Sequence, residues 1–527
     1  MGIERSATTG SLVDGTELRE NFRAAARSVA GLVGSTLGPR GMYKLVIPED
    51  GQAVVTGDPV RTLREAELDH PVGRLLYGVA TDQDGTHGDG AATAVLLAAR
   101  VLERCLGTVD SGVHPRTAHG GLDTARTVAE RTVGGLAVPV DPDPTGERLR
   151  AVARAQVRTK LLDGAEFAPV VADALETLAR DARPSEAGGL RLDADRAHVF
   201  ARTGPSRRET RRFDGVLLKK EALNPERSPV HDARVATVDG KLYLETVEGE
   251  GETGRRLRAS TPEELEALRV AEDAAHGRFV RPLLDAGVDV LVTRKGIDDR
   301  VASALIRDGV LVVRRAKPEA VLESVAAATG ATVVSDVRDI GPADLGHAGR
   351  VEELRYGPLE YTLVGECDGA AATSILTRGG TWTAAEDVER GLASALRATA
   401  AAVREPAVVP GGGHAEVQVA RALREAAVSS PSREALVFEA VADAFEDLVR
   451  ALARNVGLDP AGTLATVRAR SREGPAGIVD PLDGPARVED VEAAGVVDPL
   501  AARRGAVSAA IQAASYAVPV DEVVAVE

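Results

Sequence analysis

The chain has 527 residues, of which 64 are basic and 80 acidic, so its formal net charge is −16. A composition that is 44% hydrophobic and 27% charged is ordinary for a globular protein and excludes long-range disorder. At roughly 150 residues per domain, this length predicts about three domains. No apolar stretch approaches the ~20 residues that span a bilayer, and the N-terminus lacks the apolar core of a secretory signal. We therefore expect no membrane partner.

Cys105 and Cys367 are the only cysteines, which excludes a disulfide framework and a four-cysteine zinc site. A reducing compartment fits this usage, and we expect a cytoplasmic protein. The acidic balance argues against nucleic acid as a partner, because phosphate contacts need clustered lysine and arginine. Only seven of the basic residues are lysines. This composition fits either a salt-rich, halophilic cytosol or a GC-rich genome, and it does not separate the two.

The chain up to about residue 135 is predicted to be mainly helical. Residues 17–38 carry apolar side chains at three- and four-residue spacing, namely Leu18, Phe22, Ala25, Val29 and Val33. This helix is expected to end at Gly38-Pro39, since proline cannot continue it. A second helix, 91–106, is apolar on most faces and is therefore expected to be buried.

Two more helices are predicted at 146–162 and 167–182, joined to the rest by arginine-rich turns. From residue 215 short β-branched runs alternate with helices, which is typical of an α/β domain; the runs lie at 215–223, 233–238, 241–248, 288–296, 309–316 and 331–337. A helix at 261–287 opens with a capping box. After about residue 397 long helices return, so helical ends enclose an α/β middle. This order predicts that the two termini complete one domain.

Three glycine-containing loops are candidates for ligand binding, at 36–42, 88–93 and 410–413. The second directly precedes the buried helix, and the unpaired backbone NH groups of a helix N-terminus bind phosphate. Asp89 in this loop could hold Mg²⁺ that bridges phosphate oxygens. Taken singly, each loop is explained at least as well as a helix cap or turn. The histidines show no metal-ligand spacing, and His87 and His414 beside the loops are expected to lie at the surface.

These motifs, in this order, resemble those of the group II chaperonins, the family of the archaeal thermosome and the eukaryotic cytosolic chaperonin. TLGPRGM resembles the family's TLGPKGM, and GDGAATAVLLA resembles GDGTTTAVVLA. The stretch at 292–340 is similar to the core of the family's apical domain, and the similarity continues through VVPGGGHAEVQVA and AGVVDPLAARRGAV. It covers essentially the whole chain, with the pattern of a divergent archaeal-type subunit.

The resemblance implies a multidomain α+β fold. It implies a mainly helical equatorial nucleotide-binding domain from 1–137 and 397–527, and a small intermediate domain from 138–214 and 357–396. Residues 215–356 would form an α/β apical domain that binds non-native polypeptide, with a helical protrusion near 242–272 as a built-in lid. Family members form two stacked rings of eight or nine subunits. They close over the substrate upon binding ATP with Mg²⁺ and reopen after hydrolysis.

The resemblance also implies roles for individual residues. Gly38, Gly90 and the helix start at Ala91, Ala92 and Thr93 would approach the phosphates, and Asp89 would ligate Mg²⁺. Asp58 would lie near the attacking water, and Lys160 would sense the terminal phosphate. At the other end, Gly412 would line the adenosine pocket and Asp498 would reach the ribose.

Departures from the family pattern concentrate at the same site. The motif ERSxxDAL reads ERGLASAL here, so Ser394 stands at the position of the catalytic aspartate. A hydroxyl cannot accept a proton from water near neutral pH, and losing a positioned base costs about 10²–10⁴ in rate. Ala91 and Ala92 lack the hydroxyls of GDGTTT, while Pro59 removes an NH and Arg61 is expected to add bulk and positive charge near the phosphates.

Two interpretations follow. The first is a folding chaperonin whose hydrolysis is impaired but real, since positional and electrostatic effects dominate phosphoryl transfer. The second is a non-hydrolysing structural or regulatory subunit of a mixed ring. The retained carboxylates and Lys160 favour the first, and Ser394 favours the second. Whether another carboxylate, such as Asp84, replaces the missing base is open. A small-molecule enzyme is disfavoured, because the apical segment has no nucleophile–base pair.

Overall fold

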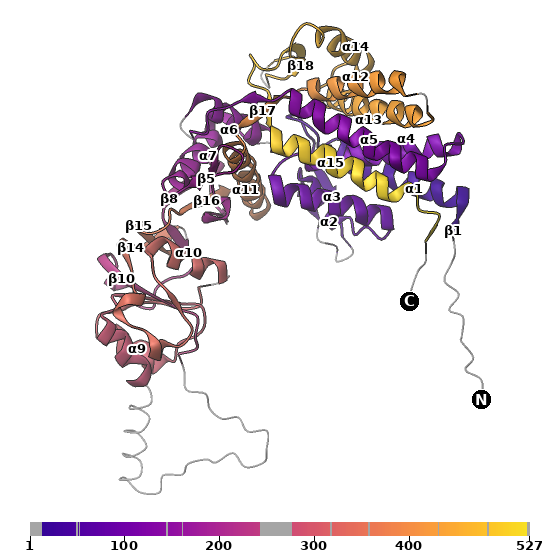
Figure 1. Cartoon of the computed structure of the whole chain (residues 1–527). Coiled ribbons are helices and arrows are strands. Elements are labelled where there is room, and N and C mark those ends of the chain that lie inside the picture. The colour runs from indigo at the N-terminus through magenta and orange to yellow at the C-terminus, as the bar shows by residue number, and fades with distance from the viewer. Residues whose placement is uncertain are drawn as a thin grey trace, which may run out of the picture.

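The computed structural model describes residues 13–48, 51, 53–143, 146–160, 162–242, 277–316, 319–356, 359–430, 432–481 and 484–523. Figure 1 shows three successive parts: a block of long helices, a smaller middle part and an α/β part. Each part has its own buried hydrophobic cluster. No helix among the described residues is both long and apolar enough to cross a membrane.

The helical part is built from both ends of the chain (Figure 1). Its helices are α1 (Gly15–Gly34), α2 (Pro59–Glu65), α3 (Pro71–His87), α4 (Ala91–Asp110), α5 (Pro115–Gly135), α12 (His414–Ser429), α13 (Glu434–Asn455), α14 (Pro460–Arg470) and α15 (Leu500–Ala517). Short strands join them: β1 (Val13–Asp14) with β21 (Glu522–Val523), β2 (Lys44–Val46) with β3 (Val54–Thr56), and β18 (Ala476–Val479) with β19 (Arg487–Asp490). Buried side chains from both ends of the chain share one hydrophobic cluster.

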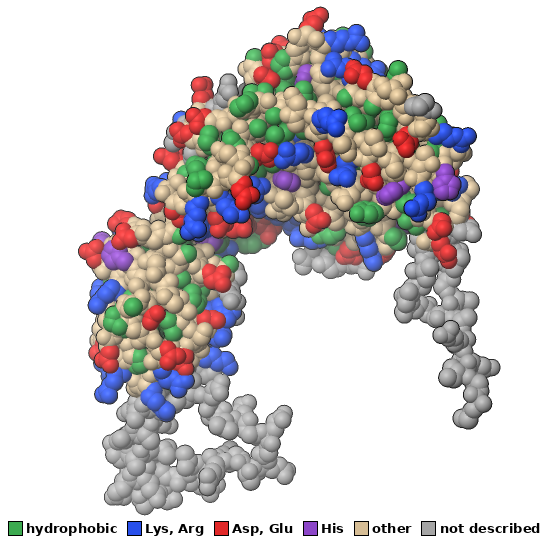
Figure 2. Space-filling model, in the orientation of Figure 1, with side chains coloured by type: hydrophobic (Ala, Val, Ile, Leu, Met, Phe, Trp, Pro, Cys, Tyr) green, Lys and Arg blue, Asp and Glu red, His purple; other side chains and the backbone are tan. Residues whose placement is uncertain are grey.

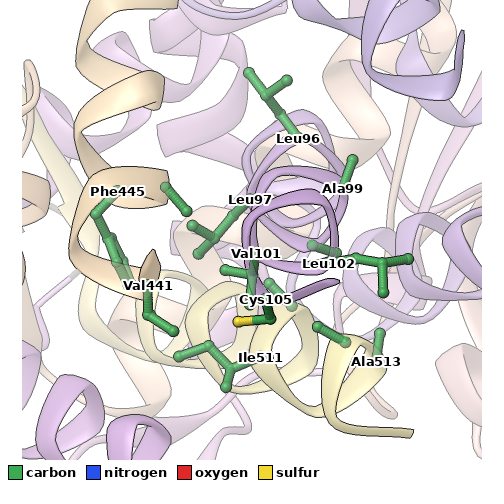
Figure 3. Packing of buried hydrophobic residues seen from close by; sticks show 14 of the residues in the cluster. Leu96, Leu97, Ala99, Val101, Leu102, Cys105, Val441, Phe445, Ile511 and Ala513 are labelled. Carbon is green, nitrogen blue, oxygen red and sulfur yellow. The ribbon is translucent and has the colours of Figure 1, made fainter. Parts of the chain in front are cut away.

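The centre of this part is α4, as its apolar sequence predicts. Twelve of its side chains are buried. Figure 3 shows several of them, including Leu97, Val101 and Cys105, packed near Val441 and Phe445 of α13 and Ile511 of α15. The first predicted helix is also present, with Leu18, Phe22, Val29 and Val33 buried, although Ala25 is only partly buried. That helix ends at Gly34, four residues before the predicted Gly38.

The middle part combines α6 (Glu147–Thr159), α7 (Gly164–Ala179) and α11 (Trp382–Arg404) with a sheet in the order β7-β16-β8. Its strands are β7 (Ala197–Thr203), β8 (Arg211–Asp214) and β16 (Thr373–Gly379). These strands were not predicted from the sequence, because β16 buries hydroxyl side chains and does not show an alternation of apolar and polar residues. Ser374 Oγ, for example, accepts from Leu217 N at 2.9 Å and donates to Gly215 O at 2.9 Å.

Two further small sheets are present. One pairs β5 (Arg183–Pro184) with β6 (Leu190–Arg191), and the other joins β4 (Val138–Pro139), β17 (Ala407–Pro410) and β20 (Val497–Pro499). The sheet of β4, β17 and β20 joins the middle and helical parts. It positions the third glycine loop, which follows β17, beside the carboxylate carried by β20.

The α/β part is a seven-stranded mixed sheet flanked by α9 (Asp299–Arg307) and α10 (Glu319–Thr329). Its strands are β9 (Val216–Leu218), β10 (Val230–Val238), β11 (Val290–Thr293), β12 (Leu311–Val313), β13 (Val333–Val334), β14 (Gly346–Tyr356) and β15 (Leu359–Cys367). Five of the predicted runs are confirmed. The sheet continues past residue 356, since β15 pairs with β14 and β9. The predicted lid near 242–272 and the run at 241–248 lie outside the described residues except for 241 and 242.

Candidate functional site

A cavity of about 300 Å³ lies between the helical and middle parts. Every residue that the sequence assigns to nucleotide or metal binding lines it: Gly38, Asp58, Asp89, Gly90, Ala91, Ala92, Thr93, Lys160, Ser394, Gly412 and Asp498. These residues come from seven separate stretches of the chain. The structure therefore brings the predicted residues together in one cavity. The two ends of this cavity are lined by different kinds of side chain.

At one end, the second glycine loop presents the N-terminus of α4 to the cavity. Gly88 and Gly90 have φ of 66° and 82°, a left-handed conformation that favours glycine. Gly90 is the N-cap and offers no side-chain cap, so the first NH groups of α4 have no side-chain acceptor at the cap. Gln83 Nε2 donates to the carbonyls of Asp89 at 2.7 Å and Ala502 at 2.9 Å, which fixes the loop. This geometry suits phosphate oxygens.

Asp89 and Lys160 form an ion pair in the wall of this end, with 3.0 Å between Nζ and Oδ1. Burial raises the pKa of Asp89, but the Lys160 ammonium and its hydrogen bond outweigh it and hold the pKa below its usual value. Burial likewise lowers the pKa of Lys160, and the charges of Asp89 and Asp84 raise it above its usual value. Both groups are therefore charged near neutral pH. A phosphate that binds Lys160 and a cation that binds Asp89 could separate the pair.

Asp58 caps the N-terminus of α2. Its Oδ1 accepts from Val60 N at 2.8 Å and Arg61 N at 3.2 Å, and its Oδ2 lies 3.8 Å from Arg390 Nε. Pro59 occupies the first helical position, where an NH would have no intrahelical partner, so the proline costs the helix nothing. The expected bulk of Arg61 is absent from the cavity lining, because its guanidinium lies 3.3 Å from Glu386 on α11. Its positive charge does reach the lining, where it acts to lower the pKa of Asp387.

Ser394 lies on α11 with 7% of its surface exposed. Its hydroxyl is 3.2 Å from Asp84 Oδ1, and Arg397 Nη2 reaches both Asp84 Oδ2 at 3.0 Å and Ser394 Oγ at 3.3 Å. The position that resembles the family's catalytic aspartate thus holds a hydroxyl bonded to a carboxylate from α3. The sequence makes Asp84 a candidate for the missing base but does not indicate its position, because no local pattern links residues that are 310 positions apart.

The opposite end of the cavity is formed by the third glycine loop and β20. Gly412 has φ of 62°, and a Cβ there would lie 2.6 Å from the carbonyl oxygen of Ile478, so only glycine fits. Asp498 is ion-paired with Arg503, which also binds Glu416. Burial raises the pKa of Asp498 even though Arg503 acts in the opposite direction. The same two carboxylates raise the pKa of Arg503, so its charge is retained.

Several residues in or beside the cavity wall were missed or misplaced by the predictions from the sequence. Arg503 sits one turn beyond Asp498 in the ARR triplet, a local signal that could have identified it. Arg40 binds Asp480 through Nε at 2.8 Å and Nη2 at 2.9 Å across 440 positions, for which no local signal exists. His414 was expected at the surface but is 4% exposed, because it begins α12 and faces Ser471 Oγ at 3.1 Å.

A metal ion at this site would rest on few protein ligands. Within the described ranges, no group of three or more His, Cys, Asp or Glu side chains could hold a metal by itself. Mg²⁺ commonly binds one or two carboxylates together with substrate phosphates. Asp89, charged and adjacent to the α4 N-terminus, fits that role.

Comparisons with known proteins identify the family of the chain. The model of the TCP-1/cpn60 chaperonin family matches residues 29–527. The chain is 35% identical to "Thermosome subunit beta" of Archaeoglobus fulgidus over 506 residues, which cover 95% of this chain and 90% of that protein. It is 35% identical to "Thermosome subunit" of Methanopyrus kandleri with the same coverage, and 31% identical to "Thermosome subunit beta" of Thermoplasma acidophilum over 96% of this chain and 92% of that protein. The chain therefore belongs to the TCP-1/cpn60 chaperonin family, as a group II chaperonin.

Proposed function

We propose that the protein is a subunit of a double-ring chaperonin that binds Mg-ATP in this cavity, hydrolyses it slowly and encloses non-native polypeptide. The helical part would be the equatorial domain, the middle part the intermediate domain, and the α/β part the apical domain. We extend the apical domain through β15, which pairs with β14 and β9. Folding in an enclosed chamber, driven by nucleotide, is the expected activity.

The observation that carries the proposal is the convergence of all predicted nucleotide residues on one cavity. The α4 N-terminus and Gly90 would hold phosphate oxygens through backbone NH groups. Lys160 would move from Asp89 onto the terminal phosphate and neutralise its charge. Asp89 would hold Mg²⁺, which would supply further charge neutralisation. Asp58, fixed as the cap of α2, would orient water near the terminal phosphate.

A second candidate is a structural or regulatory subunit that does not hydrolyse ATP. Two observations favour it. Residue 394 is a serine and not the aspartate of the family pattern, and the carboxylate of Asp498 is ion-paired with Arg503. A ribose that binds Asp498 would have to share or displace that guanidinium. The two candidates differ in turnover rather than in fold.

Nucleotide binding tests both candidates first. A fluorescent ATP analogue, titrated with Mg²⁺ into the native protein, is expected to bind, and Asp89→Ala should weaken binding about tenfold or more, since the carboxylate is the cation ligand. Asp82→Asn is the matched control, because Asp82 is exposed on α3 and absent from the cavity lining. Equal affinity in native protein and Asp89→Ala would contradict the proposed site.

The hairpin of β2 and β3 supports assembly with other subunits. Five large apolar side chains in and beside it are exposed: Met42, Tyr43, Leu45, Ile47 and Val55. Such a concentration on a two-stranded hairpin with unpaired edges marks an interaction surface. We propose that another subunit of the ring covers it.

Replacing Leu45, which is 64% exposed, with aspartate tests this surface. We expect Leu45→Asp to shift the protein from rings to smaller species in light scattering after size-exclusion chromatography, because a charge would be buried at the contact. Val428→Asp is the control, since Val428 is 88% exposed at the end of α12, away from the hairpin. Rings of native size in Leu45→Asp would refute the assignment of this surface.

A further inference from the structure

Four carboxylates line the end of the cavity where α2, α3, α4 and α11 meet: Asp58, Asp84, Asp89 and Asp387. Three of them contact a helix N-terminus or a cation, and none of the three is hydrogen-bonded to Ser394. Asp58 Oδ1 caps α2 while its Oδ2 faces Arg390, Asp89 is paired with Lys160, and Asp387 is paired with Arg390. The fourth, Asp84, is arranged differently.

Asp84 divides its two oxygens between a charge and a hydroxyl. Oδ2 lies 3.0 Å from Arg397 Nη2, which fixes the carboxylate, and Oδ1 lies 3.2 Å from Ser394 Oγ. The Ser394 hydroxyl donates to Asp84 and accepts from Arg397 at 3.3 Å. A hydroxyl oxygen has two lone pairs, so one remains to accept a hydrogen bond from the cavity, which Ser394 lines.

Backbone packing fixes this geometry. Gly88, one turn after Asp84 at the end of α3, lies directly against α11: a Cβ there would overlap the carbonyl oxygen of Ser394 and approach Ala398 N to 2.8 Å. Because any larger residue would push α3 and α11 apart, the glycine allows the close contact that brings Asp84 and Ser394 together. The pairing is therefore a consequence of helix packing and not of a freely rotating surface side chain.

We propose that Asp84 accepts, through the hydroxyl of Ser394, the proton of the water that attacks the terminal phosphate of ATP. The water oxygen bonds to the γ-phosphorus, and the bond to the β,γ-bridging oxygen breaks with its electron pair on ADP. The water proton passes to Ser394 Oγ while the serine proton passes to Asp84 Oδ1. Release of that proton to solvent restores the carboxylate, and the products are ADP and inorganic phosphate.

This relay rests on the proposed function, and it explains why the proposed hydrolysis would be slow. Two coupled proton movements replace the single transfer to a directly placed carboxylate, so turnover is slow but not absent. Ser394 would be the residue that touches the reacting water. Asp84 would act through it, with Arg397 as a positioning residue for both.

The experiment compares phosphate release and affinity for a fluorescent ATP analogue in native protein, Asp84→Asn, Ser394→Ala and the double variant. We expect each single variant to lower kcat about tenfold or more while analogue affinity stays within about twofold. The double variant should be no slower than either single variant, because both remove the same relay. Asp82→Asn, exposed on the same helix, should behave as the native protein.

Ser394→Asp provides the complementary measurement. A carboxylate at this position removes the need for the relay, so kcat should rise above the native value, and adding Asp84→Asn to Ser394→Asp should change kcat by less than about threefold. A purely structural role for Asp84 predicts the same loss in both backgrounds and would overturn the relay.

The remaining outcomes separate the relay from the proposed function. Analogue binding with turnover unchanged in Asp84→Asn, or with no turnover in the native protein, overturns the relay and leaves nucleotide binding intact. If the native protein fails to bind the analogue, the proposed function itself fails, and the relay with it.

Discussion

The two ends of the cavity use buried charge in different ways. At the end of the cavity formed by the α4 N-terminus, Lys160 and Asp89 form an ion pair, and among the described residues neither is bonded to a third charged side chain. The charge of Arg503 also helps to lower the pKa of Asp89. At the opposite end, Arg503 holds Asp498 and Glu416 at once, and its side chain is only 14% exposed. The first pair is one that a bound phosphate and a bound cation could separate, as the proposed function requires. The second cluster cannot be opened without leaving two buried carboxylates uncompensated.

From this difference we expect the Lys160–Asp89 pair to govern chemistry and the Arg503 cluster to govern stability. A simple pair that ligands can replace is suited to binding, because each partner gains a new counter-charge when the pair opens. A triad that crosses from β20 to α12 and α15 holds the structure, because its loss exposes like charges to one another. Substitutions at the two ends should therefore fail in different assays.

The largest effect is expected at the end of the cavity formed by the α4 N-terminus. Lys160→Met should lower phosphate release by about 100-fold or more, because it removes the ammonium that would neutralise the terminal phosphate. Steady-state phosphate release measures this, with Lys220→Met as the control, since Lys220 is an exposed lysine in the α/β part. A fall of less than about threefold would show that Lys160 serves only to pair with Asp89.

The next effect is expected at the opposite end. Arg503→Met should destabilise the protein by about 3–5 kcal/mol, because it leaves the carboxylates of Asp498 and Glu416 buried without their partner. Scanning calorimetry should record a drop of several degrees in Tm.

Arg504→Met is the matched control for that experiment. Arg504 is 45% exposed and pairs with Glu405 at 2.9 Å, so its loss should cost less than about 1 kcal/mol. If both variants melt at the same temperature, the arginine triad does not stabilise this end of the cavity, and the contrast between the two ends disappears.

The smallest effect concerns pH and His414, which follows the third glycine loop. Burial lowers the pKa of His414 below its ordinary value of 6.5, although a hydrogen bond from the imidazole to the Ala476 carbonyl raises it in part. Below pH 6.5 the unfolded chain then binds more protons than the folded one, so stability falls as the pH drops. The pKa values of His70, His87 and His198 are lowered in the same direction.

His414→Gln should therefore reduce, without abolishing, the loss of Tm between pH 7 and pH 5. The expected difference is about 1–2 °C, measured by calorimetry at a series of pH values. An identical pH dependence in the variant would mean that His414 stays neutral, or becomes charged without cost, in the folded protein.

Much of the fold could be predicted because its signals are local. The apolar faces of α4 and α13 and the β-branched runs of β10, β11 and β12 are readable within a few residues. The sheet of β7, β16 and β8 could not be predicted in the same way. Its central strand buries Ser374 and Thr377, which are stable there only because partners elsewhere in the chain satisfy their hydroxyls.

The residues of the site also fall into those that a local motif predicts and those that only distant contacts reveal. Glycine loops and a helix start are contiguous motifs, so Gly90, Asp89 and Gly412 could be chosen from the sequence. The contacts that decide their chemistry join distant residues: Asp84 with Ser394, and Arg40 with Asp480. Arg61 is the opposite case. It lies close to Asp58 in sequence, but its guanidinium points to Glu386.

The most direct test of slow hydrolysis at this cavity is steady-state phosphate release from Mg-ATP by the purified native protein, in molar KCl, beside Asp89→Ala. We expect slow release by the native protein and none above background for Asp89→Ala, because the cation ligand and the partner of Lys160 are both lost. Equal release by the two proteins would place the hydrolysis elsewhere, and no release by either would mean that this subunit does not turn over ATP.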